Sequence, residues 1–185
     1  MNKLTFNFKE IDKKTQSKLV QGTVIPRPIA WIETKNSDGS INLAPFSYFN
    51  VFSPTIVGVS FQSKKDTCNN ILREKTARIH SVSQSMLETM DNTAMNLAVN
   101  ESEVEKFKID LSSISKIHMD VEYYSETVLP GGEILILLQV VSVSVDESVY
   151  DQNKGYIDAT QLDPVARLAG PNYARIEQLN YKRKY

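Results

Sequence analysis

The chain has 185 residues, 41% of them hydrophobic, which is enough for one sizeable core, so we expect one domain spanning residues 1–185. Its formal net charge at pH 7 is −1, and its lysines and arginines form no basic stripe, which argues against a nucleic-acid partner. The N-terminus is polar and no run approaches roughly 18 apolar residues, so we expect no signal peptide, no membrane span and a cytoplasmic location.

The first predicted strand covers residues 24–33 and begins through two prolines, in the segment Pro26-Arg27-Pro28-Ile29-Ala30-Trp31. Because each proline fixes φ and removes an N–H donor, only a strand start or an edge position suits this segment. A turn containing Asp38-Gly39, which is a hairpin signal, separates it from a second predicted strand over residues 41–51.

The second predicted strand alternates poorly, because Asn42, Ser47 and Asn50 lie among aromatic residues and a proline. This composition is typical of a pocket wall that carries a few placed hydrogen-bonding groups. An irregular β segment without a ligand is the alternative. These residues alone leave both interpretations open.

Residues 55–61 predict a third strand, which is followed by a turn and a helix that runs to residue 74. Asp66 or Thr67 can cap the N-terminus of that helix, and Lys64 and Lys65 precede it. Helix N–H groups, a hydroxyl and nearby cations together fit a phosphate monoester. An ordinary capped helix with solvated lysines is the alternative.

The rest of the chain predicts a short strand over residues 77–83, a helix over 83–94 and a hairpin of strands 121–128 and 133–145 around Pro130-Gly131-Gly132. Valines and serines alternate at the end of the hairpin, which predicts one buried and one wetter face. The helical signals are the apolar stripe Met86, Leu87 and Met90 and the capping-box pairs Ser85 with Glu88 and Ser102 with Glu105.

Several absences narrow the chemistry. One cysteine, Cys68, excludes an internal disulfide and a Cys-x-x-Cys arrangement. The two histidines, His80 and His118, cannot supply a three-histidine site, so we expect no metal. The seven glycines form neither a dinucleotide-binding nor a Walker loop, so a nicotinamide nucleotide would have to bind without a Rossmann fold.

The motifs, taken in order, resemble those of the flavin reductase-like, FMN-binding split-barrel family, which includes flavoredoxins and NAD(P)H:flavin oxidoreductase-like proteins. The resemblance covers roughly residues 20–175. Each motif is weak alone, while the set is specific. The motifs are Arg27-Pro28-Ile29, Asp38-Gly39, Asn42-Leu43-Ala44-Pro45-Phe46-Ser47, Lys65-Asp66-Thr67 with Asn70, Glu103-Val104-Glu105-Lys106-Phe107 and Arg167-Leu168-Ala169-Gly170-Pro171-Asn172-Tyr173.

The resemblance implies a mainly β fold with short helices, an FMN-binding split β-barrel, and a homodimer with the flavin at its two-fold interface. It implies that the phosphate end of FMN is held by Ser60, Lys65, Asp66 acting through its helix cap, and Thr67, with Asn70 securing their turn. It implies that the ribityl chain and ring are lined by Arg27, Pro28, Ile29, Asn42, Ala44, Ser47 and Asn50.

A second group of residues is expected to meet the other substrate. In the family, the segment that ends at Tyr173 closes over the flavin, so Arg167, Gly170 and Tyr173 are expected to contact the ring edge, the phosphate or the reductant. His80 occupies a strand position where the family commonly has Asn. Two roles of His80 are equally open: it lines the pocket, or it is a structural strand residue whose ring is hydrogen-bonded within the protein.

The mechanism that the resemblance implies leaves the chemistry to the cofactor, so no catalytic residue is expected. NADH or NADPH would give a hydride to flavin N5, and electrons would pass to a second flavin, an iron species, oxygen or a redox protein partner. The alternatives are an FMN-binding electron carrier or sensor without nicotinamide turnover, and a split-barrel oxidase acting on a pyridoxal-type phosphate.

Overall fold

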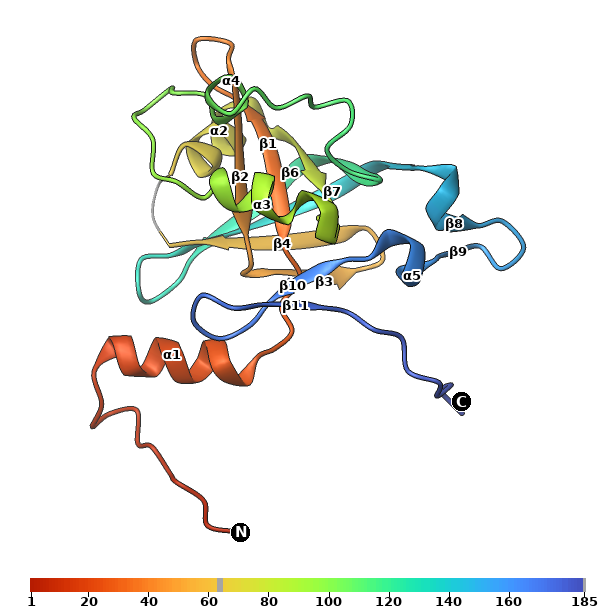
Figure 1. The fold of residues 1–185 in the computed structure, drawn as a ribbon. Helices are drawn as coiled ribbons and strands as arrows, with labels where there is room; N and C mark the ends of the chain where they lie inside the picture. Colours follow the sequence, from red (N-terminus) through yellow and green to blue (C-terminus); the bar gives the residue numbers. More distant parts are fainter. Residues whose placement is uncertain (63–64, 185) are drawn as a thin grey trace.

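A computed structural model describes residues 1–62 and 65–184 (Figure 1). Its main feature is an antiparallel sheet of seven strands in the order β2-β1-β5-β6-β7-β4-β3. The strands are β1 (Ala30–Lys35), β2 (Ile41–Phe46), β3 (Phe49–Ser53), β4 (Ile56–Phe61), β5 (Thr76–His80), β6 (Ile117–Val128) and β7 (Ile134–Val145).

A short connection brings the two edges of the sheet together. β2 and β3 lie at opposite edges of the sheet, yet only Ser47 and Tyr48 connect them. Since consecutive Cα atoms are about 3.8 Å apart, three steps bring Phe46 and Phe49 within about 11 Å of each other. The two edges therefore approach each other at this end, and the predicted mainly β split barrel is confirmed.

Short helices and strand pairs surround the sheet. α2 packs on β1, β2 and β5, and both α3 and α4 pack on β2 (Figure 1). In the described part of the chain, no helix is long and apolar enough to cross a membrane. The helices are α1 (Lys13–Thr23), α2 (Asp66–Glu74), α3 (Leu87–Asn92), α4 (Glu103–Lys106) and α5 (Ala159–Leu162). The remaining elements are the 3-10 turns Gln84–Met86 and Glu147–Val149 and the strand pairs β8 (Tyr150–Asp151) with β9 (Tyr156–Ile157) and β10 (Val165–Arg167) with β11 (Tyr173–Arg175).

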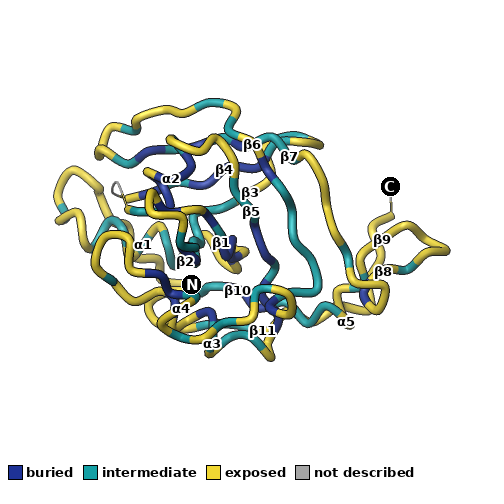
Figure 2. The backbone as a smooth tube through the Cα atoms, turned by 90° about the horizontal axis from the view of Figure 1, so that it is seen from above, coloured by how far each residue is buried: buried dark blue, intermediate teal, exposed yellow. Residues whose placement is uncertain are grey.

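The core lies on both sides of β1. Ala30 and Ile32 pack in a cluster with Phe61 and the α2 residue Ile71, whereas Trp31 belongs to a second cluster beneath α3. This alternation follows from the two-residue period of a strand, with apolar residues on both faces. Figure 2 shows the buried segments along these inner strands, while α1 has no buried residue and the β8–β9 pair is largely exposed.

The first two strands differ from the prediction. The strand expected over residues 24–33 begins only at Ala30, because Arg27 makes an isolated bridge to Arg167 and its two proline neighbours lack N–H groups. The strand expected over residues 41–51 is divided into β2 and β3 by the bend at Ser47 and Tyr48. Prolines and turn-prone residues thus mark the ends of strands here.

The predicted helices are present with different starts. Lys65, and not Asp66 or Thr67, is the N-cap of α2, and its side chain makes no capping bond. The helix expected over residues 83–94 is a 3-10 turn followed by α3, so the capping box of Ser85 with Glu88 does not form. Ser102 does cap α4, because its hydroxyl accepts the N–H of Glu105 at 3.2 Å.

The long hairpin is confirmed, but its outer end is not half-buried. β6 begins at Ile117, four residues before the predicted start. Val141 and Val143 are exposed, as are the serines between and after them, so the expected buried face is absent within one chain. α1, α5 and both small strand pairs were not predicted, since they carry no strong hydrophobic period.

Candidate functional site

Three adjoining cavities open among the described residues where β2 bends into β3, and Pro45 and Phe46 line all three. The Thr67 cavity, of about 320 Å³, lies between β2, the start of α2 and residues 93–99. The arginine cavity, of about 250 Å³, is lined by Arg27 and Arg167. The Tyr173 cavity, also of about 250 Å³, lies beside α3.

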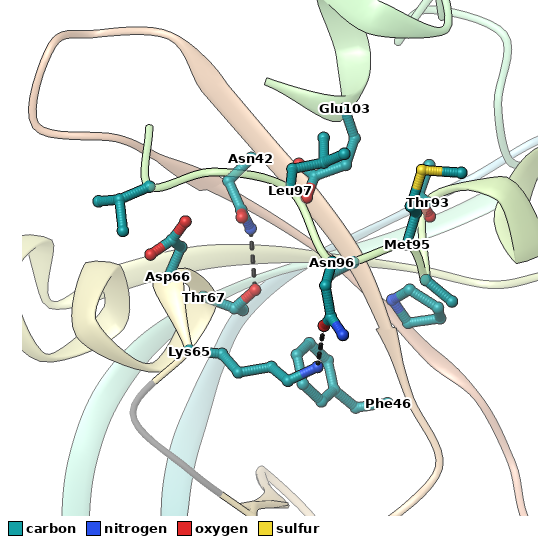
Figure 3. Close-up of a pocket in the computed structure, with 14 residues that line it drawn as sticks. Asn42, Phe46, Lys65, Asp66, Thr67, Thr93, Met95, Asn96, Leu97 and Glu103 are labelled. Carbon is teal, nitrogen blue, oxygen red and sulfur yellow. Dashed lines mark hydrogen bonds between the residues drawn. The ribbon is translucent and has the colours of Figure 1, made fainter. Parts of the chain in front are cut away.

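Thr67, with a buried hydroxyl group, and Lys65, with an ammonium group, both line the Thr67 cavity (Figure 3). Asn42 Nδ2 donates to Thr67 Oγ1 at 2.8 Å, and Lys65 Nζ donates to Asn96 Oδ1 at 3.2 Å. Because the Thr67 hydroxyl oxygen accepts from Asn42, its hydrogen can be donated to another group. The N-terminal end of α2, which carries the positive end of the helix dipole, lies at the same wall.

A buried polar network holds this wall from behind. Thr34 Oγ1 accepts from Asn42 Nδ2 at 3.2 Å and from Asn70 Nδ2 at 3.1 Å. Asn70 Nδ2 also donates to Asn36 Oδ1 at 2.8 Å. All four residues are at most 4% exposed, so the bonds are protected from water and fix α2 against the β1–β2 hairpin.

Glu103 brings a buried carboxylate to the Thr67 cavity. Its Oε2 accepts the backbone N–H of Leu43 at 3.0 Å, and the residue is 6% exposed. Burial raises the pKa of Glu103, an effect that the Leu43 hydrogen bond partly opposes and the nearby Asp66 carboxylate strengthens. The sequence indicated only a helical turn at this position.

The arginine cavity brings together segments that are far apart in the sequence. The backbones of Arg27 and Arg167 form two hydrogen bonds, of 3.0 and 2.9 Å. The Arg27 guanidinium donates to the backbone carbonyls of Gln21, Val24 and Leu168. This pairing places both arginines at one cavity.

In the Tyr173 cavity, the guanidinium carbon of Arg167 lies 4.6 Å from the centre of the Tyr173 ring, and the Tyr173 hydroxyl donates to Asp91 Oδ1 at 2.5 Å. Burial and, to a smaller extent, this hydrogen bond raise the pKa of Tyr173 to about 12. Tyr173 is therefore neutral at physiological pH and acts as a hydrogen-bonding group and a ring surface, not as a base.

Most of the predicted site residues line these cavities. They are Arg27, Ile29, Asn42, Ala44, Ser47, Ser60, Lys65, Asp66, Thr67, Arg167, Gly170 and Tyr173. Asp66 lines the Thr67 cavity with its side chain and does not cap the helix as expected. Lys64, the other predicted cation before α2, lies outside the described residues.

Pro28, Asn50, Asn70 and His80 do not line any of the three cavities. Pro28 and Asn50 are exposed, since they lie before β1 and on the outer strand β3. Asn70 lies behind the Thr67 wall, in the network described above. Pro28 and Asn50 were expected to line the flavin, because spacing along the chain cannot show which way a side chain points. Asn70 was expected to secure the turn before α2, and its position behind the Thr67 wall is compatible with that role.

His80 is a structural strand residue whose ring is hydrogen-bonded within the protein, which was one of the two expected alternatives. It is 2% exposed, and its ring nitrogens lie 3.0 Å from Glu33 Oε2 and 2.9 Å from Ser115 Oγ. It is paired with Trp31 on β1 and with His118 on β6. Both of its ring nitrogens are thus occupied away from the cavities, and a pocket role is not supported.

Other cavity residues were missed by sequence reasoning. They are Gln21, Tyr48, Phe61, Gln62, Thr93, Ala94, Met95, Asn96, Leu97, Val99 and Glu103, with Asp91 and Met90 in the Tyr173 cavity. Residues 93–99 follow α3 as an irregular segment. The sequence feature that could have indicated a cavity wall here is Asn96, a lone amide in a mainly apolar segment.

The fold and the site define a class of protein: a small split-barrel protein with a polar cavity, rich in hydroxyl, amide and cationic groups, beside an apolar wall. Residues 22–161 match the family model described as "Flavin reductase like domain". The chain therefore belongs to the flavin reductase-like family, whose members are flavin-binding oxidoreductases.

Two curated or solved relatives are similar over nearly the whole chain. A Bacillus subtilis protein, "Uncharacterized protein YwrF", is 33% identical over 92% of this chain and 94% of its own length. The structure of nitrilotriacetate monooxygenase component B from Bacillus cereus has 32% identity and a TM-score of 0.90, covering 98% of this chain and 100% of that chain. The flavoredoxin of Desulfovibrio vulgaris, at 16% identity, has a TM-score of 0.74 over 87% of this chain and 92% of its own, which shows the shared fold.

Proposed function

We propose that this protein binds FMN and is an NAD(P)H-dependent flavin reductase. The observation that carries the proposal is the Thr67 cavity, where a buried hydroxyl, a lysine ammonium and the end of a helix meet at one wall. The bound flavin supplies hydride acceptance at N5 and electron transfer onward to a flavin, an iron species or a protein acceptor. We further infer that the protein works in the cytoplasm as a homodimer.

The residues of the site fit a flavin mononucleotide. Cofactor cavities usually measure about 300–1,000 Å³ and combine apolar walls with a few polar groups. The Thr67 cavity measures about 320 Å³ and continues past Pro45 and Phe46 into its neighbours. The donor set, a hydroxyl, amides and a lysine, matches a phosphate, a polyol chain and a ring edge with carbonyls.

Each part of the site has a proposed task. Lys65 and Thr67 hold the phosphate, and Asn42 fixes the direction of the Thr67 hydroxyl. Figure 3 shows the Asp66 carboxylate and the Lys65 ammonium on opposite sides of Thr67. The phosphate therefore binds on the lysine side, where Asp66 repels it least. Ala44 and the neighbouring Phe46 offer apolar surface to the flavin ring.

The first test is flavin retention by the purified protein. After addition of FMN and gel filtration, we expect the absorption bands of oxidised flavin to stay with the protein, and NADH or NADPH to bleach them under anaerobic conditions. Retained flavin that neither nucleotide reduces would favour an electron carrier or sensor instead. A protein that retains no flavin and shows no FMN-dependent NADH or NADPH oxidation would contradict the proposed function.

The second test assigns the phosphate site. Lys65→Ala combined with Thr67→Ala should weaken FMN binding at least about tenfold, because each charged hydrogen bond contributes about 1.5–3 kcal/mol and 1.4 kcal/mol is a factor of ten. The affinity for riboflavin, which lacks the phosphate, should fall much less in the same fluorescence titration. The matched control is Lys154→Ala with Thr160→Ala, both exposed and distant from the cavities. Equal losses for both flavins would overturn the assignment.

A further inference from the structure

The N-terminal arm, which comprises residues 1–25, lies outside the core of its own chain. It consists of an irregular segment and α1, and α1 has no buried residue. A helix shorter than roughly 12–15 residues is marginal in water unless one of its faces packs against another surface. α1 has 11 residues, so its stability calls for a surface that covers it.

One side of the arm is an apolar groove of about 390 Å³. Phe6 and Phe8 of the irregular segment and Val20 of α1 line it, and each is between 44% and 47% exposed. Exposed apolar patches of this kind mark interaction surfaces. The arm is also basic, because it carries two carboxylates against five lysines, all exposed, which are Lys3, Lys9, Lys13, Lys14 and Lys18.

The rest of the chain has the opposite charge, with twenty aspartates and glutamates against sixteen lysines and arginines. A second groove on this part, the acidic groove, measures about 420 Å³ and lies along β1, β5 and β6. Val141 lines it together with four carboxylates, those of Glu33, Glu74, Asp120 and Glu122. The exposed Val143 follows on the same strand. Negative charge and exposed apolar side chains thus meet on this surface.

The cations of the acidic groove do not cancel its charge. They are Lys35 and Arg78, and Arg78 is already paired with Asp120 at 2.8 Å. Glu122 is exposed and forms no ion pair within residues 1–62 and 65–184. A basic segment with apolar side chains therefore matches this groove in both charge and polarity.

The arm cannot cover the acidic groove of its own chain. Lys35 and Ile41, which flank the β1–β2 turn, line the groove, and Figure 1 shows this turn at the opposite end of the molecule from α1. Each chain therefore carries one arm and one groove that match but lie apart. A two-fold dimer satisfies both, since the arm of each copy can meet the groove of the other.

The position of the arm also affects the arginine cavity. Gln21 of α1 lines this cavity, and its Nε2 donates to the Tyr48 hydroxyl at 2.8 Å. The Arg27 guanidinium donates to the backbone carbonyls of Gln21 and Val24, at the end of the arm. A surface that fixes the arm therefore also fixes one wall of the arginine cavity.

We propose that the N-terminal arm of one chain docks on the acidic groove and the Val141–Val143 surface of a second copy, and that this contact holds the arginine cavity in shape. The inference rests on the homodimer of the proposed function. It adds the two surfaces that meet, and it links assembly to the cavity that adjoins the proposed flavin-phosphate site.

The test is a charge exchange between the two surfaces. The arm variant is Lys13→Glu with Lys14→Glu and Lys18→Glu, and the groove variant is Glu74→Lys with Glu122→Lys, all at exposed positions. Glutamates in the first turn of α1 favour the helix dipole, so a loss of dimer in the arm variant is not a loss of the helix. The control, with the same change of charge outside the arm, is Lys154→Glu with Lys182→Glu and Lys184→Glu.

We expect the arm variant and the groove variant each to raise the dimer dissociation constant at least about tenfold in sedimentation velocity, because like charges would face each other. The variant that combines both sets should return to within about threefold of the wild type, and the control should stay within the same range. FMN affinity should fall at least about fivefold in the monomeric arm variant, a typical coupling between linked sites, and recover in the combined variant.

Three results would overturn the proposal. An arm variant as dimeric as the wild type would show that the arm is not at the interface, and a combined variant that stays monomeric would show that the arm meets another surface. A monomeric wild type that sediments with vesicles of phosphatidylglycerol and phosphatidylcholine would assign the arm to a lipid surface instead.

The flavin readout separates this proposal from the proposed function. Unchanged FMN affinity in the monomeric arm variant would overturn the link to the arginine cavity. If the wild type retained no FMN, the proposed function would fail, whereas recovery of the dimer by the charge exchange would still support docking of the arm, because sedimentation does not depend on flavin.

Discussion

At the scale of single residues, burial gives Glu103 a property that its sequence position does not show. Its carboxylate lies at the wall of the Thr67 cavity and accepts one backbone N–H, while burial raises its pKa. The folded protein therefore binds this proton more tightly than the unfolded chain does. The stability that results is fully present below the ordinary pKa of a glutamate and is lost as the pH rises through the raised pKa.

Glu103→Gln should remove this pH dependence, because Gln cannot ionise and can still accept the N–H of Leu43. We expect the variant to melt about 2–4 °C above the wild type at about pH 7.5, the effect of about 1 kcal/mol in a protein of this length. The difference should shrink at about pH 4.5, because protonation of the Glu103 carboxyl becomes more favourable as the pH falls. Thermal melts at both pH values provide the measurement. Glu105→Gln, an exposed neighbour on α4, is the control and should show no such trend.

At the scale of elements, the position of α2 depends on polar bonds as much as on its apolar face. Ile71 anchors the helix in the core, while Asn70 bonds to Thr34 and Asn36 of the first hairpin. Since Asn42 shares the Thr34 hydroxyl, the same network reaches Thr67. The predicted role of Asn70 in securing the Lys65-Asp66-Thr67 turn remains a proposal that this geometry supports.

Asn70→Ala should loosen α2, because it leaves the buried Asn36 side-chain oxygen without its donor, at a cost of about 1–3 kcal/mol. We expect faster hydrogen exchange at the amides of α2 and a lower urea midpoint, with β6 and β7 less affected locally. The matched control is Asn50→Ala, at an exposed asparagine of β3. If α2 exchanged no faster in Asn70→Ala than in the control, the network would not be what holds the helix.

At the scale of the whole molecule, an apolar surface is left uncovered on the outer hairpin. Val141 is 59% exposed and Val143 is 53% exposed, on the same face of β7. α1 also has no buried residue. Exposed apolar patches of this kind mark interaction surfaces, which supports the proposed homodimer.

Light scattering should give a mass near twice the 20.9 kDa of the chain. Val141→Glu with Val143→Glu should shift the protein to monomers, because the charges would be buried at the interface. Ser144→Glu, on the opposite face of the same strand, should leave the dimer intact. A monomeric wild type at micromolar concentration would contradict the homodimer, and a dimeric double variant would exclude this surface.

The sequence by itself determined the local elements and the chemistry available to them. The Asp38-Gly39 turn, the period of β1, the start of α2 near Lys65 and the Ser102 cap follow from short-range preferences of backbone and side chains. The order of motifs also determined the family, and most of the predicted ligand residues do line the cavities.

Only the tertiary structure decided which of these residues meet. The return of β3 to the far edge of the sheet, the pairing of Arg27 with Arg167 and the burial of Glu103 join segments that are distant in the chain. The same structure turns His80 toward Glu33, away from the cavities. The physical reason is that burial and charge depend on long-range packing, which local spacing does not contain.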